Sequence, residues 1–198
     1  MSKNSSANSH KRFLLIRTDR IGDTILTLPA VTALRSQYQD AFIAFLAQPY
    51  TVPLIEQYVG IDISLSYEPH GRHKGWQGLS KLSHELQELN FDAALLFYPR
   101  VKLAFAIAKA GIPVRIGTGY RWYSFLLTER IFEHRKDCQK HEAEYNFSLL
   151  ESLLPDKNTQ PQYKFKQWLP EPWWEDFRTV LNSKDYVIVH PGYGASAP

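Results

Sequence analysis

The feature that most constrains the fold is a repeated alternation of short apolar runs with amphipathic segments. Five runs have the composition of buried strands: FLLIR (13–17), AFIAFLA (41–47), IDISLSY (61–67), DAALLFYP (92–99) and VRIG (114–117). Apolar residues at helical spacing predict helices over 27–38, 51–58, 79–89, 101–110 and 141–154. Strands that alternate with helices form a parallel sheet covered on both faces. We therefore predict an α/β domain with strand 13–17 at its centre.

In such sheets ligands bind beyond the carboxyl ends of the strands. The segments that follow predicted strands are residues 17–24, 68–78, 98–102 and 117–122. They carry the basic residues Arg72, Lys74, Arg100 and Arg121. Because these segments share one edge of the sheet, we predict that the basic side chains form an anion site there. His70 and His73, in the Gly-rich loop EPHGRHKGWQG (68–78), are expected to be solvated.

The loop RTDRIGD (17–23) places a glycine and an aspartate where the first helix should begin. Gly22 permits a close backbone approach or an unusual dihedral angle. Asp23 has two interpretations, as a helix N-cap that contributes about 1 kcal/mol or as a functional carboxylate. The loop lacks the GxGxxG pattern, so a dinucleotide fingerprint is not supported. Pro29 is compatible with a first helical turn or with a kink.

Composition excludes several classes of protein. The net charge of +3 is too small to indicate a nucleic-acid partner. The single cysteine, Cys138, excludes an internal disulfide framework and fits a reducing cytosol. No apolar stretch approaches the roughly 20 residues of a membrane span, and the polar start of the chain lacks the apolar core of a signal peptide. His134, Cys138 and His141 have ligand-like spacing, but we expect no metal there.

The last residues predict the start of another unit. Residues 155–172 have the composition of a linker, PWWEDFRTVLNS of a helix, and DYVIVHPGYGASAP of a strand followed by a Gly-rich loop. Gly192 and Gly194 could expose backbone N–H groups to a phosphate. The predicted organisation is a disordered tail (1–11), a first domain (12–170), a connecting helix (171–184) and the first strand and loop of a truncated second domain (185–198).

Taken in order, these motifs carry a family resemblance. RTDRIGD followed by LTLPAVTALR resembles the opening of glycosyltransferase family 9, the ADP-heptose:lipopolysaccharide heptosyltransferases. DAALLFYPRVKLAFAIAKAGIPVRIG and KHEAEYNFSLL are similar to later segments of that family's first domain, and VIVHPGYGASAP to the start of its second. The resemblance covers nearly the whole chain from residue 13.

The resemblance implies a GT-B architecture, in which two Rossmann-like domains face a cleft. The first domain would bind the acceptor and the second the nucleotide-sugar donor. It implies an inverting transfer of heptose from ADP-heptose to the lipopolysaccharide inner core, with Asp23 as the general base. Arg20 would steer anionic acceptor groups or favour the charged form of Asp23. Gly22, beside it, would belong to the acceptor site, and Gly192, Gly194 and Ser196 would contact the donor.

Further expectations concern partners and location. The ADP-sugar is a co-substrate, and no cofactor is expected. The acceptor is a lipid-linked saccharide, which places the protein at the cytoplasmic face of the inner membrane, without a nucleic-acid partner. Since the family continues with a second domain where this chain stops after Pro198, a lone half should bind acceptor weakly and should not turn over. Two alternatives stay open: a non-catalytic acceptor-binding remnant, and an unrelated nucleotide-binding Rossmann-like protein.

Overall fold

The structure, a computed structural model, describes residues 11–133, 140–154 and 162–166. All of these residues belong to one compact unit, which ends at Lys166. Most of the predicted tail and the whole of the predicted segments 171–184 and 185–198 lie outside the described residues. The proposed domain organisation around them therefore stays a prediction.

A six-stranded sheet forms the centre of the unit, and every pairing between its strands is parallel. In spatial order the strands are β3 (Ile63–Ser66), β2 (Phe42–Ala47), β1 (Arg12–Ile16), β4 (Ala93–Leu96), β5 (Val114–Thr118) and β6 (Glu129–Ile131). The predicted parallel α/β fold and the central place of the first strand are confirmed. Strand β6 was not predicted, because three residues are too few to show a periodic pattern.

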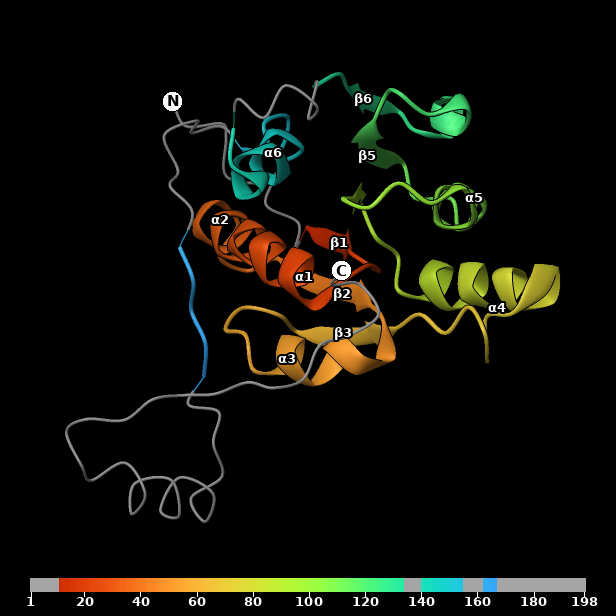
Figure 1. Cartoon of the computed structure of the whole chain (residues 1–198), viewed down its shortest axis with the longest axis horizontal. Helices are drawn as coiled ribbons and strands as arrows, with labels where there is room; N and C mark the ends of the chain where they lie inside the picture. The colour runs from red at the N-terminus through yellow and green to blue at the C-terminus, as the bar shows by residue number, and fades with distance from the viewer. Residues whose placement is uncertain (1–10, 134–139, 155–161, 167–198) are drawn as a thin grey trace, which may run out of the picture. The chain divides into compact units, whose positions relative to one another are not determined.

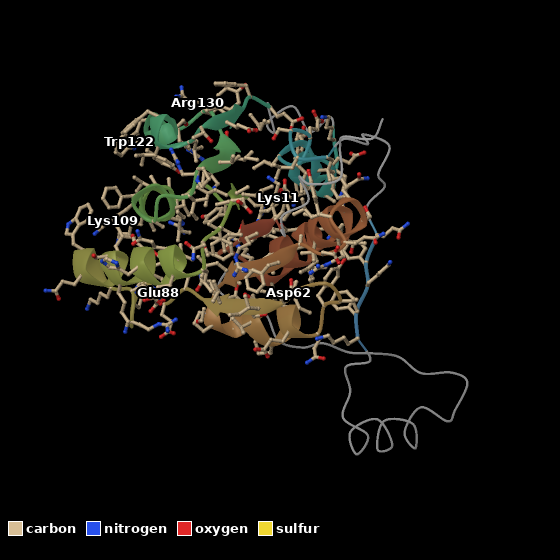
Figure 2. All side chains as sticks on the ribbon, turned by 180° about the vertical axis from the view of Figure 1, so that it is seen from behind. Lys11, Asp62, Glu88, Lys109, Trp122 and Arg130 are labelled. Atoms are coloured by element: carbon tan, nitrogen blue, oxygen red, sulfur yellow. The ribbon has the colours of Figure 1, made fainter. Side chains whose placement is uncertain are left out.

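Helices cover both faces of the sheet (Figure 1). One layer contains α1 (Ile21–Thr27), α2 (Pro29–Gln37), α3 (Val52–Glu56) and α6 (Glu142–Ser148), with the short 3-10 helix η1 (Pro49–Thr51). The other contains α4 (Gly75–Glu88), α5 (Val101–Lys109) and the 3-10 helix η2 (Trp122–Leu126). Lys109 and Trp122 project from this second layer (Figure 2). No helix within the described residues is long and apolar enough to cross a bilayer.

Strand β1 explains why two layers are needed. Its side chains alternate between faces, so Phe13 and Leu15 join the core under α2 while Leu14 and Ile16 join the core under α4 and α5. All four are buried. A strand that is apolar on both faces must be covered on both faces. This is why FLLI is a continuous apolar run and does not alternate apolar with polar residues.

Several helix boundaries differ from the sequence-based prediction; the helix predicted over 141–154, for example, ends at Ser148. The helix predicted over 27–38 begins earlier, as α1, and is divided where Pro29 becomes the first residue of α2. Proline lacks the N–H of a continuing helix, but at a first turn that N–H has no intrahelical partner. Helix α4 begins at Gly75 rather than at 79, because Gly78 lets it pack closely on the preceding loop: a Cβ there would lie 2.3 Å from the His73 carbonyl carbon.

Candidate active site

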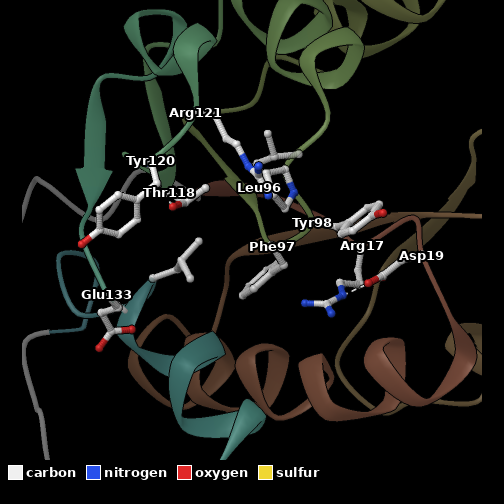
Figure 3. A pocket seen from close by; sticks show the side chains of 11 residues that line it. Arg17, Asp19, Leu96, Phe97, Tyr98, Thr118, Tyr120, Arg121 and Glu133 are labelled. Carbon is white, nitrogen blue, oxygen red and sulfur yellow. Dashed lines mark hydrogen bonds and ion pairs between the residues drawn. The ribbon is translucent and has the colours of Figure 1, made fainter. Parts of the chain in front are cut away.

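The carboxyl ends of β1, β4 and β5 surround a cavity of about 630 Å³. Its wall includes Arg17 and Asp19 after β1, Phe97 and Tyr98 after β4, and Arg121 after β5, with Glu133 and Leu149 completing it. Figure 3 shows Arg17 and Asp19 on one side, Tyr120 and Glu133 on the other, and Phe97 between them. The predicted clustering of post-strand segments at one edge is confirmed for these three strands.

Arg17 is the electrostatic centre of this edge. Its side chain is only 4% exposed, and its Nε donates to Asp19 Oδ1 at 2.7 Å. Its Nη2 lies 3.1 Å from Asp23 Oδ1, and its Nη1 lies 3.6 Å from Glu142 Oε1. A buried guanidinium is tolerated only when its charge is paired and its N–H groups are bonded, and here three carboxylates surround it.

Asn146 fixes the other side of this network. Its Oδ1 accepts from Arg17 Nη1 at 3.3 Å, and its Nδ2 donates to the Leu26 carbonyl and to Thr27 Oγ1, both at 3.2 Å. Asn146 is fully buried in α6, whereas its amide partners belong to α1. The late segment KHEAEYNFSLL therefore holds the first loop in place across more than a hundred residues of chain.

Asp23 lies in the first turn of α1, but it is not the N-cap. Arg20 occupies the cap position, and its side chain makes no capping hydrogen bond. The carboxylate of Asp23 instead pairs with Arg17 and stays 32% exposed. The N-cap interpretation of Asp23 is therefore wrong, and it is Arg17 rather than Arg20 that forms its ion pair. Arg20 is exposed.

Gly22 shows neither the close backbone approach nor the unusual dihedral angle that its residue type permits. It lies within α1 without a positive φ angle, and a Cβ at that position would meet nothing within 4 Å. The chain bends earlier, at Asp19, and Gln48 Nε2 donates to the neighbouring Thr18 carbonyl at 2.8 Å. The open space beside Gly22 faces solvent, since the residue is exposed.

Asp19 is the second carboxylate at this edge and lines the cavity. Burial raises the pKa of its carboxyl above the ordinary value of 3.8, although Arg17 acts in the opposite direction and the charge of Asp23 adds to the rise. The Tyr50 hydroxyl donates to the Asp19 carbonyl at 2.7 Å. The pKa of Tyr50 is raised by desolvation and then by the charges of Asp19 and Asp23, so the phenol stays a neutral donor.

The predicted basic residues separate into two groups. Arg121 lines the cavity, and Arg100 lies with its Cζ 4.7 Å from the centre of the Tyr98 ring. Burial raises the pKa of Tyr123, and the charges of both arginines oppose that rise. Arg72 is engaged elsewhere, since its guanidinium meets Glu85 at 3.7 Å and Glu68 at 3.8 Å. Lys74 is exposed at the start of α4.

His73 is buried, which corrects the expectation that it is solvated. Its ring stacks on Tyr67, its Nδ1 accepts from the Glu68 N–H at 3.0 Å, and its Nε2 lies 3.2 Å from Glu85 Oε2. Gly78 makes this burial possible by letting the helix approach the loop. His70 is exposed, as expected.

Most of the residues in the donor and metal predictions lie outside the part of the chain that the structure describes. Gly192, Gly194 and Ser196, predicted to contact the donor, lie outside them, as do His134 and Cys138. Among residues 11–133, 140–154 and 162–166, no group of three or more His, Cys, Asp or Glu side chains has the arrangement of a metal site.

Sequence reasoning missed Arg17 and Asn146, which organise the site. A usable signal existed for the first. An arginine directly after four apolar strand residues begins inside the core, so it requires partners from distant segments. The sequence offered no comparable signal for Asn146, because an asparagine within an amphipathic helix usually faces solvent.

Comparisons with known proteins agree with this geometry. No protein-family model matches the chain. A curated protein of Haemophilus influenzae, named "Putative glycosyltransferase", is 25% identical over 199 aligned residues, which cover 94% of this chain and 56% of that protein. The chain thus spans little more than half the length of this relative.

Solved structures show the same fold. A glycosyl transferase family 9 protein from Veillonella parvula superposes with a TM-score of 0.74 at 21% identity, over 86% of this chain and 49% of the other. E. coli ADP-heptose lps heptosyltransferase II gives 0.63 at 22% identity, over 85% and 50%. E. coli heptosyltransferase WaaC with ADP-2-deoxy-2-fluoro heptose gives 0.64 at 19% identity, over 76% and 51%. The chain is therefore similar in sequence to a named glycosyltransferase and has the fold of about half of a family 9 heptosyltransferase.

Proposed function

We propose that this chain is the acceptor-side half of a glycosyltransferase that moves heptose, or a related sugar, from an ADP-sugar to the inner core of lipopolysaccharide. One observation carries the proposal: buried Arg17 forms ion pairs with three carboxylates. These carboxylates lie beside an open cavity at the carboxyl edge of the sheet. The fold likeness to heptosyltransferases supports the sugar class, and the structures solved with ADP and an ADP-heptose analogue support the donor class.

The proposed reaction is a single inverting displacement. An acceptor hydroxyl attacks the anomeric carbon of the sugar from the face opposite the leaving group. A bond forms between that oxygen and the anomeric carbon, the bond from this carbon to the ADP oxygen breaks, and ADP leaves. The hydroxyl proton passes to Asp23, which must come within about 2.6–3.2 Å of it. Because Arg17 contacts Oδ1, the Oδ2 atom of Asp23 is the proposed proton acceptor.

Basic side chains along the edge would position the anionic acceptor. Arg121 at the cavity wall and Arg100 nearby are the strongest candidates, with Lys74 and Arg20 at its exposed margin and Gly22 leaving room beside the base. Arg72 can take part only if it leaves Glu68 and Glu85. Gly192, Gly194 and Ser196 are proposed donor contacts in a second domain of a GT-B architecture. The ADP-sugar serves as co-substrate, without a cofactor, at the cytoplasmic face of the inner membrane.

One observation favours a second possibility for the base. Asp19 lines the cavity and has a raised pKa, which suits a proton acceptor better than an ordinary carboxylate does. Asp19 is, however, largely buried and bonded to Arg17 Nε at 2.7 Å, so it is less free to reach a substrate. We assign it to positioning Arg17. The alternative that the experiment must exclude is an acceptor-binding remnant without turnover, since similarity to a named glycosyltransferase argues against an unrelated nucleotide-binding protein.

The test compares Asp23→Asn with Asp19→Asn in a version of the protein that also carries the second domain. Asp23→Asn should lower the turnover number by about 100-fold or more, the scale of a lost general base, while ADP-sugar affinity and thermal unfolding stay close to those of the parent. Asp19→Asn should lower turnover less. The reverse order of effects would make Asp19 the base, and near-parental turnover in both variants would refute a general base at this edge. Absence of any sugar transfer by the parent would favour the remnant.

A further inference from the structure

Three consecutive strand-to-helix connections of this fold share an unusual pattern. Each ends in a basic residue at the helix N-cap, and an exposed apolar residue follows in the first turn. The pairs are Lys74 with Trp76 in α4, Arg100 with Val101 in α5, and Arg121 with Trp122 in η2. Because each helix follows a parallel strand, all three pairs lie at the carboxyl edge of the sheet, beside the candidate site.

The basic caps oppose local preference. Helix N-termini carry partial positive charge and favour Ser, Thr, Asp or Asn at the cap. The side chains of Lys74 and Arg100 make no capping hydrogen bond. A cost repeated at two neighbouring helices indicates selection for something other than helix stability.

The exposed rings form what we call the aromatic face: Trp76, Phe105, Trp122 and Phe125. Trp76 and Trp122 are 77% and 78% exposed, and Phe125 is 65% exposed. The rings of Trp76 and Phe105 meet edge to face at 6.0 Å, which joins α4 to α5, and Trp122 and Phe125 lie 6.5 Å apart in η2. These helices lie side by side over one face of the sheet (Figures 1 and 2). Large exposed apolar groups of this kind mark an interaction surface.

Charge beside the α5 and η2 part of the aromatic face is of one sign. Residues 93–128 contain five Lys or Arg and no Asp or Glu, although the whole chain carries a net charge of only +3. Lys102, Arg100 and Arg121 are exposed within this stretch. A protein partner of mixed charge does not require such segregation, whereas an anionic lipid surface does.

We propose that the aromatic face and its basic neighbours dock this protein on the headgroups of an anionic bilayer. Trp and Phe rings sit at the level of the headgroups, and the flanking Lys and Arg side chains reach the lipid phosphates. This docking proposal rests on the proposed function in one respect: docking would bring the cavity edge to a lipid-linked saccharide. Binding to plain lipid requires neither donor nor acceptor.

The experiment measures cosedimentation of the full chain with vesicles of phosphatidylethanolamine and phosphatidylglycerol, and with neutral phosphatidylcholine vesicles. We expect binding to the anionic vesicles that weakens as salt rises. The triple variant W76S/W122S/F125S should lose at least about tenfold in affinity, since the interfacial anchors are gone. Lys102→Glu should weaken binding further at low salt. Tyr163→Ser and Lys164→Glu are the matched controls, because they change exposed residues of the segment that packs beside Tyr58 on the opposite layer.

Three results would overturn the proposal that the aromatic face docks on a bilayer. They are no binding to anionic vesicles, equal binding by the triple variant, and sedimentation of the parent as a dimer that the triple variant abolishes. The last would assign the aromatic face to contact between two copies of the chain. ADP-sugar binding and transfer, measured without vesicles, test the proposed function separately, so either proposal can fail while the other holds.

Discussion

At the scale of single residues, Arg17 determines what the carboxyl edge can do. Within the described part of the chain, its guanidinium forms ion pairs with Asp19, Asp23 and Glu142. By holding Asp23 Oδ1 while leaving the carboxylate one-third exposed, it would orient the proposed base without burying it. Precise placement of a reacting group contributes to rate as much as its acidity does.

Arg17→Met should be strongly destabilising. The substitution keeps much of the side-chain volume but leaves Asp19 and its neighbours without their buried partner, and loss of one member of a buried pair costs about 3–5 kcal/mol. Urea unfolding followed by circular dichroism measures the change. The control is Arg72→Met, whose ion pairs are exposed and should contribute at most about 1 kcal/mol. Similar losses in the two variants would show that the Arg17 network does not stabilise the fold.

At the scale of elements, most of the fold could be predicted from the sequence and part of the site could not. Three of the five predicted strands, over 13–17, 41–47 and 92–99, are dominated by continuous apolar runs, and the other two are short apolar-rich segments. Their presence and the parallel sheet therefore follow from pattern alone. Which loops share an edge follows from the topology. The partners of Arg17 did not follow, because Asn146 and Glu142 reach it only after the chain has passed through the whole sheet. Local pattern carries no information on such contacts.

In the connection between β3 and α4, local sequence again failed to predict a tertiary contact. That contact makes the stability of the fold depend on pH. His73 was expected in solvent because its loop is rich in Gly, yet Gly78 lets it lie buried beneath α4. Tyr67 stacks on the ring, and Glu85, Glu68 and Arg72 are the charged groups that act on it. Burial lowers the pKa of His73 below the ordinary value of 6.5, although the hydrogen bond with Glu85 opposes this.

The fold should therefore lose stability on acidification. Between the lowered folded pKa and 6.5 the unfolded chain binds more protons than the folded chain, so the contribution of neutral His73 is present above 6.5 and is lost as the pH falls through the folded value. His73→Gln, which cannot titrate, should show a shallower decrease in unfolding free energy between about pH 7 and about pH 5. Urea titrations at each pH measure it, with Gln77→Ala, in the first turns of the neighbouring helix α4, as a non-titrating control. Equal slopes for His73→Gln and the parent would contradict a buried neutral imidazole.

At the scale of the whole molecule, one rim of the sheet concentrates the features that bear on function. The clamped carboxylates, the cavity and the aromatic face all follow carboxyl ends of parallel strands. The opposite ends of the same strands carry structural pairs instead, such as Asp92 with the Arg12 N–H at 2.7 Å and Asp62 with Arg35 at 2.7 Å. This division is what an open parallel sheet imposes, since its strand ends are not equivalent.

The described unit should fold without the residues beyond Lys166. Its last contacts are those of residues 162–166 with α3 and the residues after it: Phe165 meets the Tyr58 ring at 5.0 Å, and the Lys166 N–H donates to the Gln57 carbonyl at 2.7 Å. The Tyr58 hydroxyl also donates to the Gln162 carbonyl at 2.9 Å. A chain of residues 1–166 keeps all of these contacts, so we expect cooperative unfolding with a Tm within a few degrees of the parent.

A chain of residues 1–161 loses this cover over Tyr58. An aromatic pair contributes about 0.5–1.5 kcal/mol beyond the area it buries, and unpaired backbone and hydroxyl groups add to the loss. With a shift of roughly 2–4 °C per kcal/mol, the Tm should fall by about 5 °C or more. Phe165→Ala in the full chain isolates the ring and should give part of that decrease. If residues 1–166 unfold without a cooperative transition while the full chain retains one, then residues 167–198 contribute to the core of this unit and the boundary at Lys166 is wrong.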